Sequence, residues 1–95
     1  MSAEKGPKID VSATPNPNAM KFTLDRKLIE RGSRSYATRF EALDDPLAES
    51  LFAVPGVQSL FFMADFITVI KDSGAAWESI VPAVSSAIRE HLPAA

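Results

Sequence analysis

Residues 55–71 form the most apolar part of the chain and contain two short runs rich in aromatic and β-branched residues. The runs are Val57–Met63 and Phe66–Lys71, and their composition is typical of β-strands. Only Ala64 and Asp65 separate them. Because so short a connection cannot cross over to a parallel partner, we predict an antiparallel hairpin.

Apolar residues of the first run occupy both faces of the predicted strand. Alternation places Val57, Phe61 and Met63 on one face and Leu60 and Phe62 on the other. This composition suits a central strand, or a strand with one buried face and one partly covered face. We therefore expect the other elements to pack on or pair with the hairpin. An exposed Leu60 or Phe62 would support a dimer.

Two earlier segments alternate apolar and polar residues with a period of two, which predicts half-buried strands. They are residues 9–13 and 20–24. The intervening residues 14–19 hold two prolines and two asparagines, which exclude regular structure and favour turns. The pattern predicts two strands joined by a turn-rich loop.

Helix signals flank the hairpin. Asp45 is the expected N-cap, Pro46 fits the first helical position, and the Pro-Gly pair before the hairpin ends this helix. A continuous apolar face predicts a second helix at residues 76–92. Pro82 costs little if that helix begins near Ser79, whereas an earlier start predicts a kink.

A further strand is predicted at residues 35–40, with Tyr36 and Phe40 on the same face. The order ββ(β)αββα predicts the α+β class, as a two-layer sandwich of one mainly antiparallel sheet and two helices. We assign residues 9–92 to a single domain and residues 1–8 to a flexible tail.

The composition excludes several kinds of site. The 95 residues include no cysteine, so disulfides, cysteine nucleophiles and clusters held by thiolates are excluded on this chain. No apolar run approaches the roughly 18 residues of a spanning helix. The polar N-terminus lacks the apolar core of a secretion signal. We predict a soluble, cytoplasmic protein without membrane association.

Candidate catalytic residues are few, and we predict that the protein is not an enzyme. Asp44 and Asp45 suit helix capping better than a metal pair, and Asp65 suits a turn that bonds its own backbone. His91, the single histidine, suits a helix C-terminus. No base accompanies the serines of the second helix.

Basic residues are concentrated in the first half of the chain, and they raise the possibility of a nucleic-acid surface. Those in the most basic segment are Lys21, Arg26, Lys27, Arg31, Arg34 and Arg39. However, the isoelectric point is about 5.3, and the aromatic residues are needed for the core. A solvated basic face is therefore the favoured interpretation, and nucleic acid is not an expected partner.

Several blocks of residues, in this order and spacing, resemble the N-terminal domain of the Nfu/NifU-type iron–sulfur scaffold proteins. They are Thr14-Pro-Asn-Pro-Asn-Ala-Met-Lys-Phe, Pro46-Leu-Ala, Leu51-Phe, Pro55-Gly-Val-Gln-Ser-Leu-Phe-Phe and Asp65-Phe-Ile-Thr-Val-Ile-Lys, followed by Trp77 and Pro82. The resemblance covers about residues 9–92. None of these blocks is a catalytic signature.

The resemblance implies a role in the assembly or delivery of iron–sulfur clusters. Full-length members carry the cluster on a Cys-x-x-Cys pair in a second, C-terminal domain, so we expect a stand-alone form that lacks this domain. It would be a non-enzymatic accessory or adaptor module without its own cofactor. Its partners would be assembly or client proteins, or a separate Cys-x-x-Cys scaffold. The alternative is a small protein that binds iron or another divalent metal through Asp44, Asp45 or Asp65.

The candidate partner-binding residues are Thr14, Asn16, Asn18 and Lys21. The prolines between them restrict the loop, which lowers the entropic cost of ordering it on a partner. The asparagines offer amide donors and acceptors, and Lys21, with the basic residues after it, suits an acidic partner. The other interpretation, that the asparagines only close turns, stays open.

Overall fold

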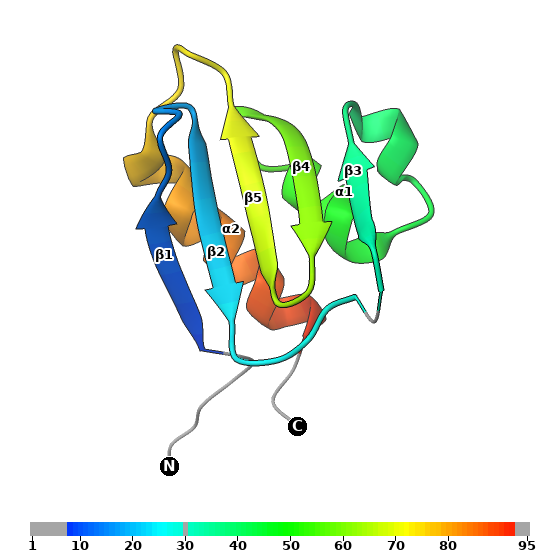
Figure 1. Cartoon of the computed structure of the whole chain (residues 1–95). Helices are drawn as coiled ribbons and strands as arrows, with labels where there is room; N and C mark the ends of the chain where they lie inside the picture. Colours follow the sequence, from blue (N-terminus) through cyan, green and yellow to red (C-terminus); the bar gives the residue numbers. More distant parts are fainter. Residues whose placement is uncertain (1–7, 30, 93–95) are drawn as a thin grey trace.

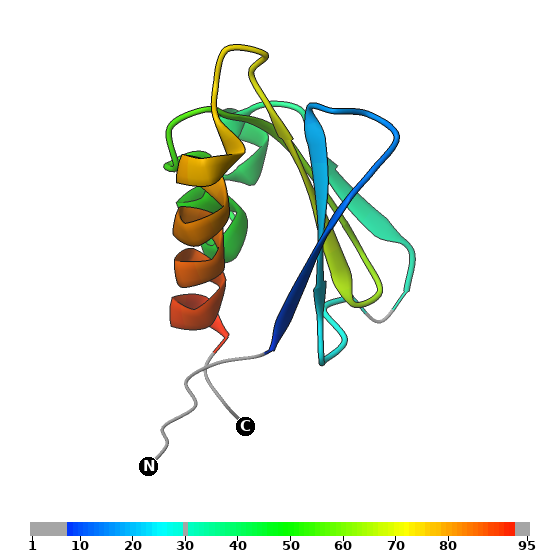
Figure 2. The same ribbon diagram turned by 90° about the vertical axis from the view of Figure 1, so that its left-hand side faces the viewer.

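The computed structural model describes residues 8–29 and 31–92, which form a five-stranded antiparallel sheet with two α-helices on one face (Figures 1 and 2). The order across the sheet is β1-β2-β5-β4-β3. The strands are β1 (Ile9–Ala13), β2 (Ala19–Leu24), β3 (Ser33–Tyr36), β4 (Val57–Met63) and β5 (Phe66–Lys71). The helices are the 3-10 helix η1 (Arg39–Ala42), α1 (Pro46–Phe52) and α2 (Trp77–His91). The predicted fold class is confirmed.

The domain boundaries stay a prediction. Except for Lys8, which is exposed, the predicted tail at residues 1–8 lies outside the described residues. Among the helices that are described, none is long and apolar enough to cross a membrane.

The hairpin predicted from the apolar runs lies at the centre of the sheet. β4 pairs with β5 along its length, β5 also pairs with β2, and β3 pairs with β4 at the other side. The tight connection is made by Ala64, whose φ is 49°. The backbone oxygens of this connection accept hydrogen bonds from Leu24 and Leu28 of the neighbouring segment. The hairpin therefore organises the sheet as predicted.

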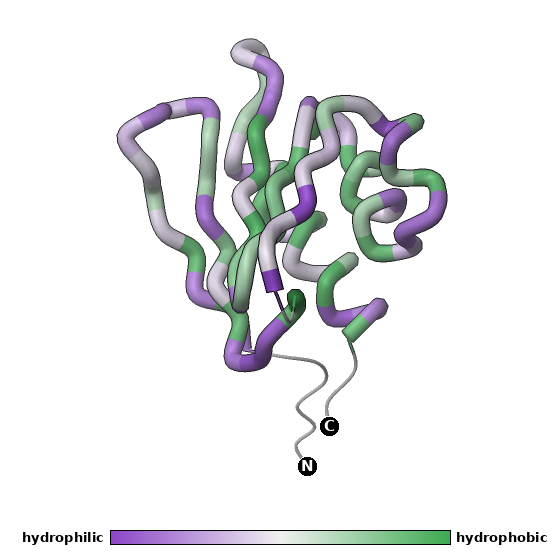
Figure 3. Tube along the Cα trace, turned by 45° about the vertical axis from the view of Figure 1, so that its right-hand side comes forward, coloured by the Kyte–Doolittle hydropathy of each residue, from purple (hydrophilic) through white to green (hydrophobic). Residues whose placement is uncertain are grey.

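The two faces of the sheet are unequal. The helices cover one face, where the buried side chains of the strands meet those of α1 and α2. The largest fully buried residues are Phe22, Leu51, Ile67, Ile80, Ile88, Val69 and Val84. No element among the described residues covers the opposite face, which Figure 1 shows toward the viewer and which we call the open face. Figure 3 shows short hydrophobic and hydrophilic stretches following one another along the Cα trace.

The predicted assignment of faces in β4 is wrong at its first residue. The register shifts between Val57 and Ser59, so Val57 pairs with Lys71 and shares the covered face with Leu60 and Phe62. A β-bulge adds one residue and thereby inverts the alternation on one side of it. Leu60 and Phe62 are only 2% and 3% exposed, so neither is available for the suggested dimer.

The strand predicted at residues 35–40 is only partly correct. β3 ends at Tyr36, and η1 follows. The Glu41 carboxylate accepts a hydrogen bond of 2.8 Å from the backbone N–H of Ala37, and this local bond turns the chain. Tyr36 is buried but Phe40 is 76% exposed, so the prediction that they share a face is wrong.

The predicted start of α1 is confirmed, whereas α2 starts earlier than the favourable case for its proline. The Asp45 carboxylate accepts a hydrogen bond from the backbone N–H of Ala48, and Pro46 occupies the first turn. α2 begins at Trp77, so Pro82 lies inside it. A proline at this position cannot donate to the carbonyl of Glu78 four residues earlier. The kink remains a prediction.

Candidate functional site

The polar side chains of the loop at residues 14–19 bond mainly to the loop itself. The Thr14 hydroxyl lies 2.9 Å from the carbonyl oxygen of Asn16 and 3.0 Å from that of Ala19, and it accepts from the Asn16 N–H. The Asn16 side-chain oxygen accepts from the N–H of Asn18 at 2.9 Å. Such bonds close turns. Thr14 and Asn16 therefore fix the shape of this loop.

The same loop is bonded to β5 and to the start of α2, beside which it lies in Figure 1. Lys71 is only 8% exposed, and its ammonium donates to the Asn18 side-chain oxygen at 3.1 Å and to the Asp72 carbonyl at 3.3 Å. The Trp77 indole N–H donates to the Pro17 carbonyl at 3.0 Å. A buried ammonium needs such acceptors. Asn18 thus connects the loop to the covered side of the sheet.

Lys21 lies on a different surface from the other three predicted residues. Its neighbours in β2, Met20 and Phe22, belong to the covered side, so Lys21 projects from the open face. Its ammonium lies 4.4 Å from the centre of the Phe66 ring. The structure brings Thr14, Asn16 and Asn18 together and places Lys21 apart from them. Partner binding by these residues stays a prediction.

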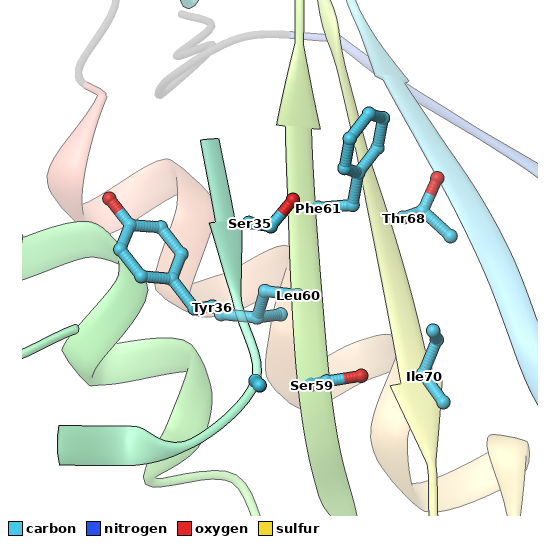
Figure 4. Close-up of a pocket in the computed structure, with 8 residues that line it drawn as sticks. Ser35, Tyr36, Ser59, Leu60, Phe61, Thr68 and Ile70 are labelled. Carbon is cyan, nitrogen blue, oxygen red and sulfur yellow. The ribbon is translucent and has the colours of Figure 1, made fainter. Parts of the chain in front are cut away.

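The open face carries half-buried aromatic and aliphatic side chains. Register places Lys21 beside Thr68 and Thr68 beside Phe61, while Ser35 of β3 lies beyond Phe61. These four residues make one row across β2, β5, β4 and β3. Ile70, one row further along β5, shares this face (Figure 4).

A shallow hollow of about 440 Å³ opens on this face between β3 and β5. Its lining residues are Ser35, Tyr36, Ala37, Ser59, Leu60, Phe61, Thr68 and Ile70. Figure 4 shows that Tyr36 points away from the other labelled side chains. Sequence reasoning missed the hollow because its residues come from three strands whose register no local pattern specifies. The alternation of Phe66, Thr68 and Ile70 was the available signal.

The Asp45 carboxylate joins α1 to β3. It accepts a hydrogen bond of 2.8 Å from the Tyr36 hydroxyl and lies 3.6 Å from the Arg34 guanidinium. Burial, and then the hydrogen bond to Asp45, raise the pKa of Tyr36 above its ordinary value of 10.0. Both contacts are made by Oδ2, and Oδ1 accepts from the Ala48 N–H, so both oxygens of Asp45 are engaged within the fold.

The other residues weighed for metal binding do not gather in one place. Asp44 and Asp65 are exposed in separate connections. The His91 ring nitrogen Nδ1 lies 3.1 Å from the Ala87 carbonyl oxygen and 3.4 Å from the Ser50 hydroxyl. Across residues 8–29 and 31–92, no group of three or more histidine, aspartate or glutamate side chains could hold a metal ion.

The basic residues considered for nucleic-acid binding are also divided between surfaces. Lys21 belongs to the open face, whereas Arg34 pairs with Asp45 on the covered side. Arg26 lies 3.7 Å from the carboxylate of Asp25. The expectation that nucleic acid is not a partner stays a prediction.

Comparison with known proteins gives a consistent result. Residues 9–95 match the family described as scaffold protein Nfu/NifU N terminal. A NifU-like protein of Schizosaccharomyces pombe is 44% identical over 81 residues, which cover 83% of this chain and 31% of that protein. The human NFU1 iron-sulfur cluster scaffold homolog is 36% identical over 83 residues, covering 86% of this chain and 33% of that protein. The chain thus spans about a third of the length of these relatives.

A solved structure supports the same relationship. The solution structure of a NifU-like protein from Saccharomyces cerevisiae superposes with a TM-score of 0.78 at 30% identity. The match covers 95% of this chain and 82% of that one.

The predicted cytoplasmic localisation is wrong by this comparison. Relatives from Arabidopsis thaliana, Drosophila ananassae and human are named as mitochondrial proteins. The prediction used the lack of an apolar signal core at the N-terminus. That observation does not bear on mitochondria, because mitochondrial transit peptides are amphipathic and arginine-rich rather than continuously apolar.

Proposed function

Because the chain belongs to the family of Nfu/NifU scaffold N-terminal domains, we propose that it acts in the assembly or delivery of iron–sulfur clusters. The match over residues 9–95 carries this proposal, together with relatives that are named as iron-sulfur cluster scaffolds. The role is that of a non-enzymatic accessory module that works through protein partners. Those partners are assembly or client proteins, or a scaffold bearing a Cys-x-x-Cys pair.

The chain contributes no thiolate to a cluster because it contains no cysteine. In the proposed role, the cluster is cargo that a partner holds, and this domain brings the partners together. The loop at residues 14–19 supplies one contact region, because its internal hydrogen bonds and prolines leave little freedom to lose on binding. Lys21 supplies a charge for an acidic partner.

Anaerobic purification of the tagged protein from its own cells tests the proposal. We expect iron–sulfur assembly proteins or iron–sulfur clients to be enriched over a tag-only control, as identified by mass spectrometry. Enrichment of other proteins alone, with no member of either group, would count against it.

A matched pair of variants tests the loop. Asn16→Asp keeps the side-chain oxygen that accepts from the N–H of Asn18 and replaces only the amide donor with a charge. Asn16→Ala removes both. If the loop contacts a partner directly, Asn16→Asp loses the captured proteins while its thermal unfolding stays close to that of the wild type. Full capture by both variants would move the contact to another surface.

A further inference from the structure

We propose that the open face binds a partner segment in which one large apolar side chain is flanked by carboxylates. The apolar side chain occupies the hollow between β3 and β5, and a carboxylate pairs with Lys21. This inference deepens the proposed function, on which it rests for the partner's place in iron–sulfur biogenesis. The binding chemistry itself is argued from the open face.

The apolar part of the argument rests on residues that the fold leaves incompletely buried. Phe61, Phe66 and Ile70 are half-buried, and Met63 is 43% exposed, all on the open face. The Phe61 and Phe66 rings contact each other with centres 6.3 Å apart. Burying further apolar area on a partner is favourable. A contiguous exposed apolar patch marks a binding surface.

The hollow gives this patch a shape. Its volume of about 440 Å³ is large enough for one aliphatic or aromatic side chain. Hydroxyls of Ser35, Ser59 and Thr68 stand among its apolar walls (Figure 4). They can hydrogen-bond to the backbone of an incoming segment. The occupant is therefore an apolar side chain with its peptide backbone, rather than a purely hydrocarbon surface.

The charge of Lys21 selects the residues that flank the apolar side chain. Lys21 is the register neighbour of Thr68, which lines the hollow, and its ammonium lies over the ring of Phe66, which packs against Phe61 of the same lining. Within the described part of the chain, no carboxylate lies within ion-pair distance of it. Its contact is the Phe66 ring. A partner carboxylate next to the apolar anchor would form an ion pair with the Lys21 ammonium.

A single-stranded nucleic acid fits this face less well. Exposed aromatics on a sheet can stack bases, but affinity for nucleic acid comes largely from several lysine or arginine contacts to phosphates. Register places just two charged residues on the open face of the described strands, Asp10 and Lys21, so these strands offer phosphates one cation there and not several. The protein segment is therefore the occupant that the charges favour.

Nuclear magnetic resonance titration of the isotope-labelled chain with three capped peptides tests the inference. The probes are Asp-Glu-Phe-Glu-Asp, its charge-reversed form Lys-Lys-Phe-Lys-Lys, and Asp-Glu-Ser-Glu-Asp, which lacks the apolar anchor. We expect the first peptide to shift the amide signals of Ser35, Ser59 and Thr68. We expect it to bind about fivefold more tightly than either control. The charge-reversed peptide lacks the ion pair with Lys21, and the serine peptide lacks the ring that enters the hollow, and each loss is of about this size. Added salt should weaken the charge preference.

Two substitutions address the two parts of the surface separately. Lys21→Glu should reverse the preference between the acidic and the basic phenylalanine peptide, whereas Arg89→Glu should leave it unchanged. Arg89→Glu makes the same change of charge, but at an exposed position of α2, which lies on the other side of the sheet. Ser59→Phe should fill the hollow and weaken binding of the acidic phenylalanine peptide about fivefold, although the substitution makes the open face more apolar. Thermal unfolding of each variant confirms that it is folded.

Several results would overturn the inference. Equal affinity for all three peptides, or shifts confined to α1 and α2, would remove the open face as their site. Tighter binding of an oligouridine RNA with a steep salt dependence would assign the face to nucleic acid. Concentration-dependent shifts on this face without peptide, lost in Phe61→Thr, would assign it to a second copy of the chain.

Capture experiments separate the inference from the proposed function. If Lys21→Glu with Ser59→Phe captures the same iron–sulfur proteins as the wild type, the inference fails and the proposed function stands. If peptides bind as expected but the wild type captures no such protein, the proposed function fails and the open-face chemistry is supported.

Discussion

Phe61 and Phe62 are adjacent in β4 but lie on opposite faces of the sheet, and they differ in burial and in contacts. Phe62 is 3% exposed and packs edge-on against Tyr36, with ring centres 5.6 Å apart at 80°. Phe61 is half-buried against Phe66 and lines the hollow. The same residue type therefore belongs to the core on one face and to a candidate binding surface on the other.

Two lysines repeat this contrast. Lys71 projects to the covered face, where two oxygen acceptors and the Trp77 ring surround its ammonium. Lys21 projects to the open face, where the Phe66 ring is its contact. Groups on the covered face are thus satisfied within the fold, whereas groups on the open face retain capacity for a partner. Substitutions should accordingly change stability on the first face and binding on the second.

The largest expected effect compares the two phenylalanines. Phe62→Ala should lower the free energy of unfolding by about 4 kcal/mol, because it removes a buried ring and leaves a cavity. Phe61→Ala should cost about 1 kcal/mol, because its ring is already partly hydrated in the native state. Denaturant unfolding followed by circular dichroism measures both. Equal losses would show that the open face is as essential to the core as the covered face.

The next comparison uses two glycines with positive φ. Gly56, with φ of 97°, lies in the covered layer, and a Cβ there would come within 2.7 Å of the Cβ of Ala75. Gly32, with φ of 69°, would place a Cβ with nothing within 4 Å. Gly56→Ala should therefore cost about 3 kcal/mol, from backbone strain and overpacking. Gly32→Ala should cost about 1 kcal/mol from strain alone. Thermal unfolding of the two variants measures the difference in stability. A similar loss of stability in both would mean that Ala75 and Ile80 move aside at little cost to make room for the added Cβ.

The sequence was sufficient to predict the elements that local chemistry specifies. The hairpin follows from two β-rich runs and a two-residue connection, and the start of α1 follows from Asp45 and Pro46. The segment around Phe40 was misassigned because a side-chain bond from Glu41 to the backbone ends β3 early, and alternation does not encode that bond.

The candidate site was harder to predict because it depends on pairing between distant segments. Lys21 and Phe61 lie in one row of the sheet only through the registers of β2 with β5 and of β5 with β4. A bulge in β4 also inverts the face of Val57. Register is a non-local property, so the loop at residues 14–19 was visible as a motif but the open face was not.

The lysines give a smaller expected effect on stability. Lys71→Met keeps most of the buried stem but removes the ammonium that donates to Asn18, and it should cost about 1 kcal/mol. Lys21→Met should change stability by less than about 0.5 kcal/mol, as for surface substitutions generally. Chemical denaturation at neutral pH measures both. A larger loss for Lys21→Met would contradict the assignment of that lysine to binding rather than folding.

The last prediction concerns the pH dependence of stability at Tyr36, whose hydroxyl donates a hydrogen bond to Asp45 on the covered side. Its pKa is raised above 10.0 in the folded chain, chiefly by burial. Below pH 10 the tyrosine is protonated in both states, so its contribution to stability is fully present. As the pH rises from 10 through the folded pKa, the unfolded chain releases its proton first, and the free energy of unfolding falls.

Tyr36→Phe isolates this contribution. The variant should lose about 1 kcal/mol at neutral pH with the hydrogen bond to Asp45, and its stability should fall less steeply than that of the wild type above pH 10. Because Tyr36 is the single tyrosine, tyrosinate absorbance of the native protein reports the same group directly. Native absorbance that titrates at the ordinary value, with parallel stability curves for the two proteins, would show that the Tyr36 hydroxyl is as accessible to water as groups on the open face.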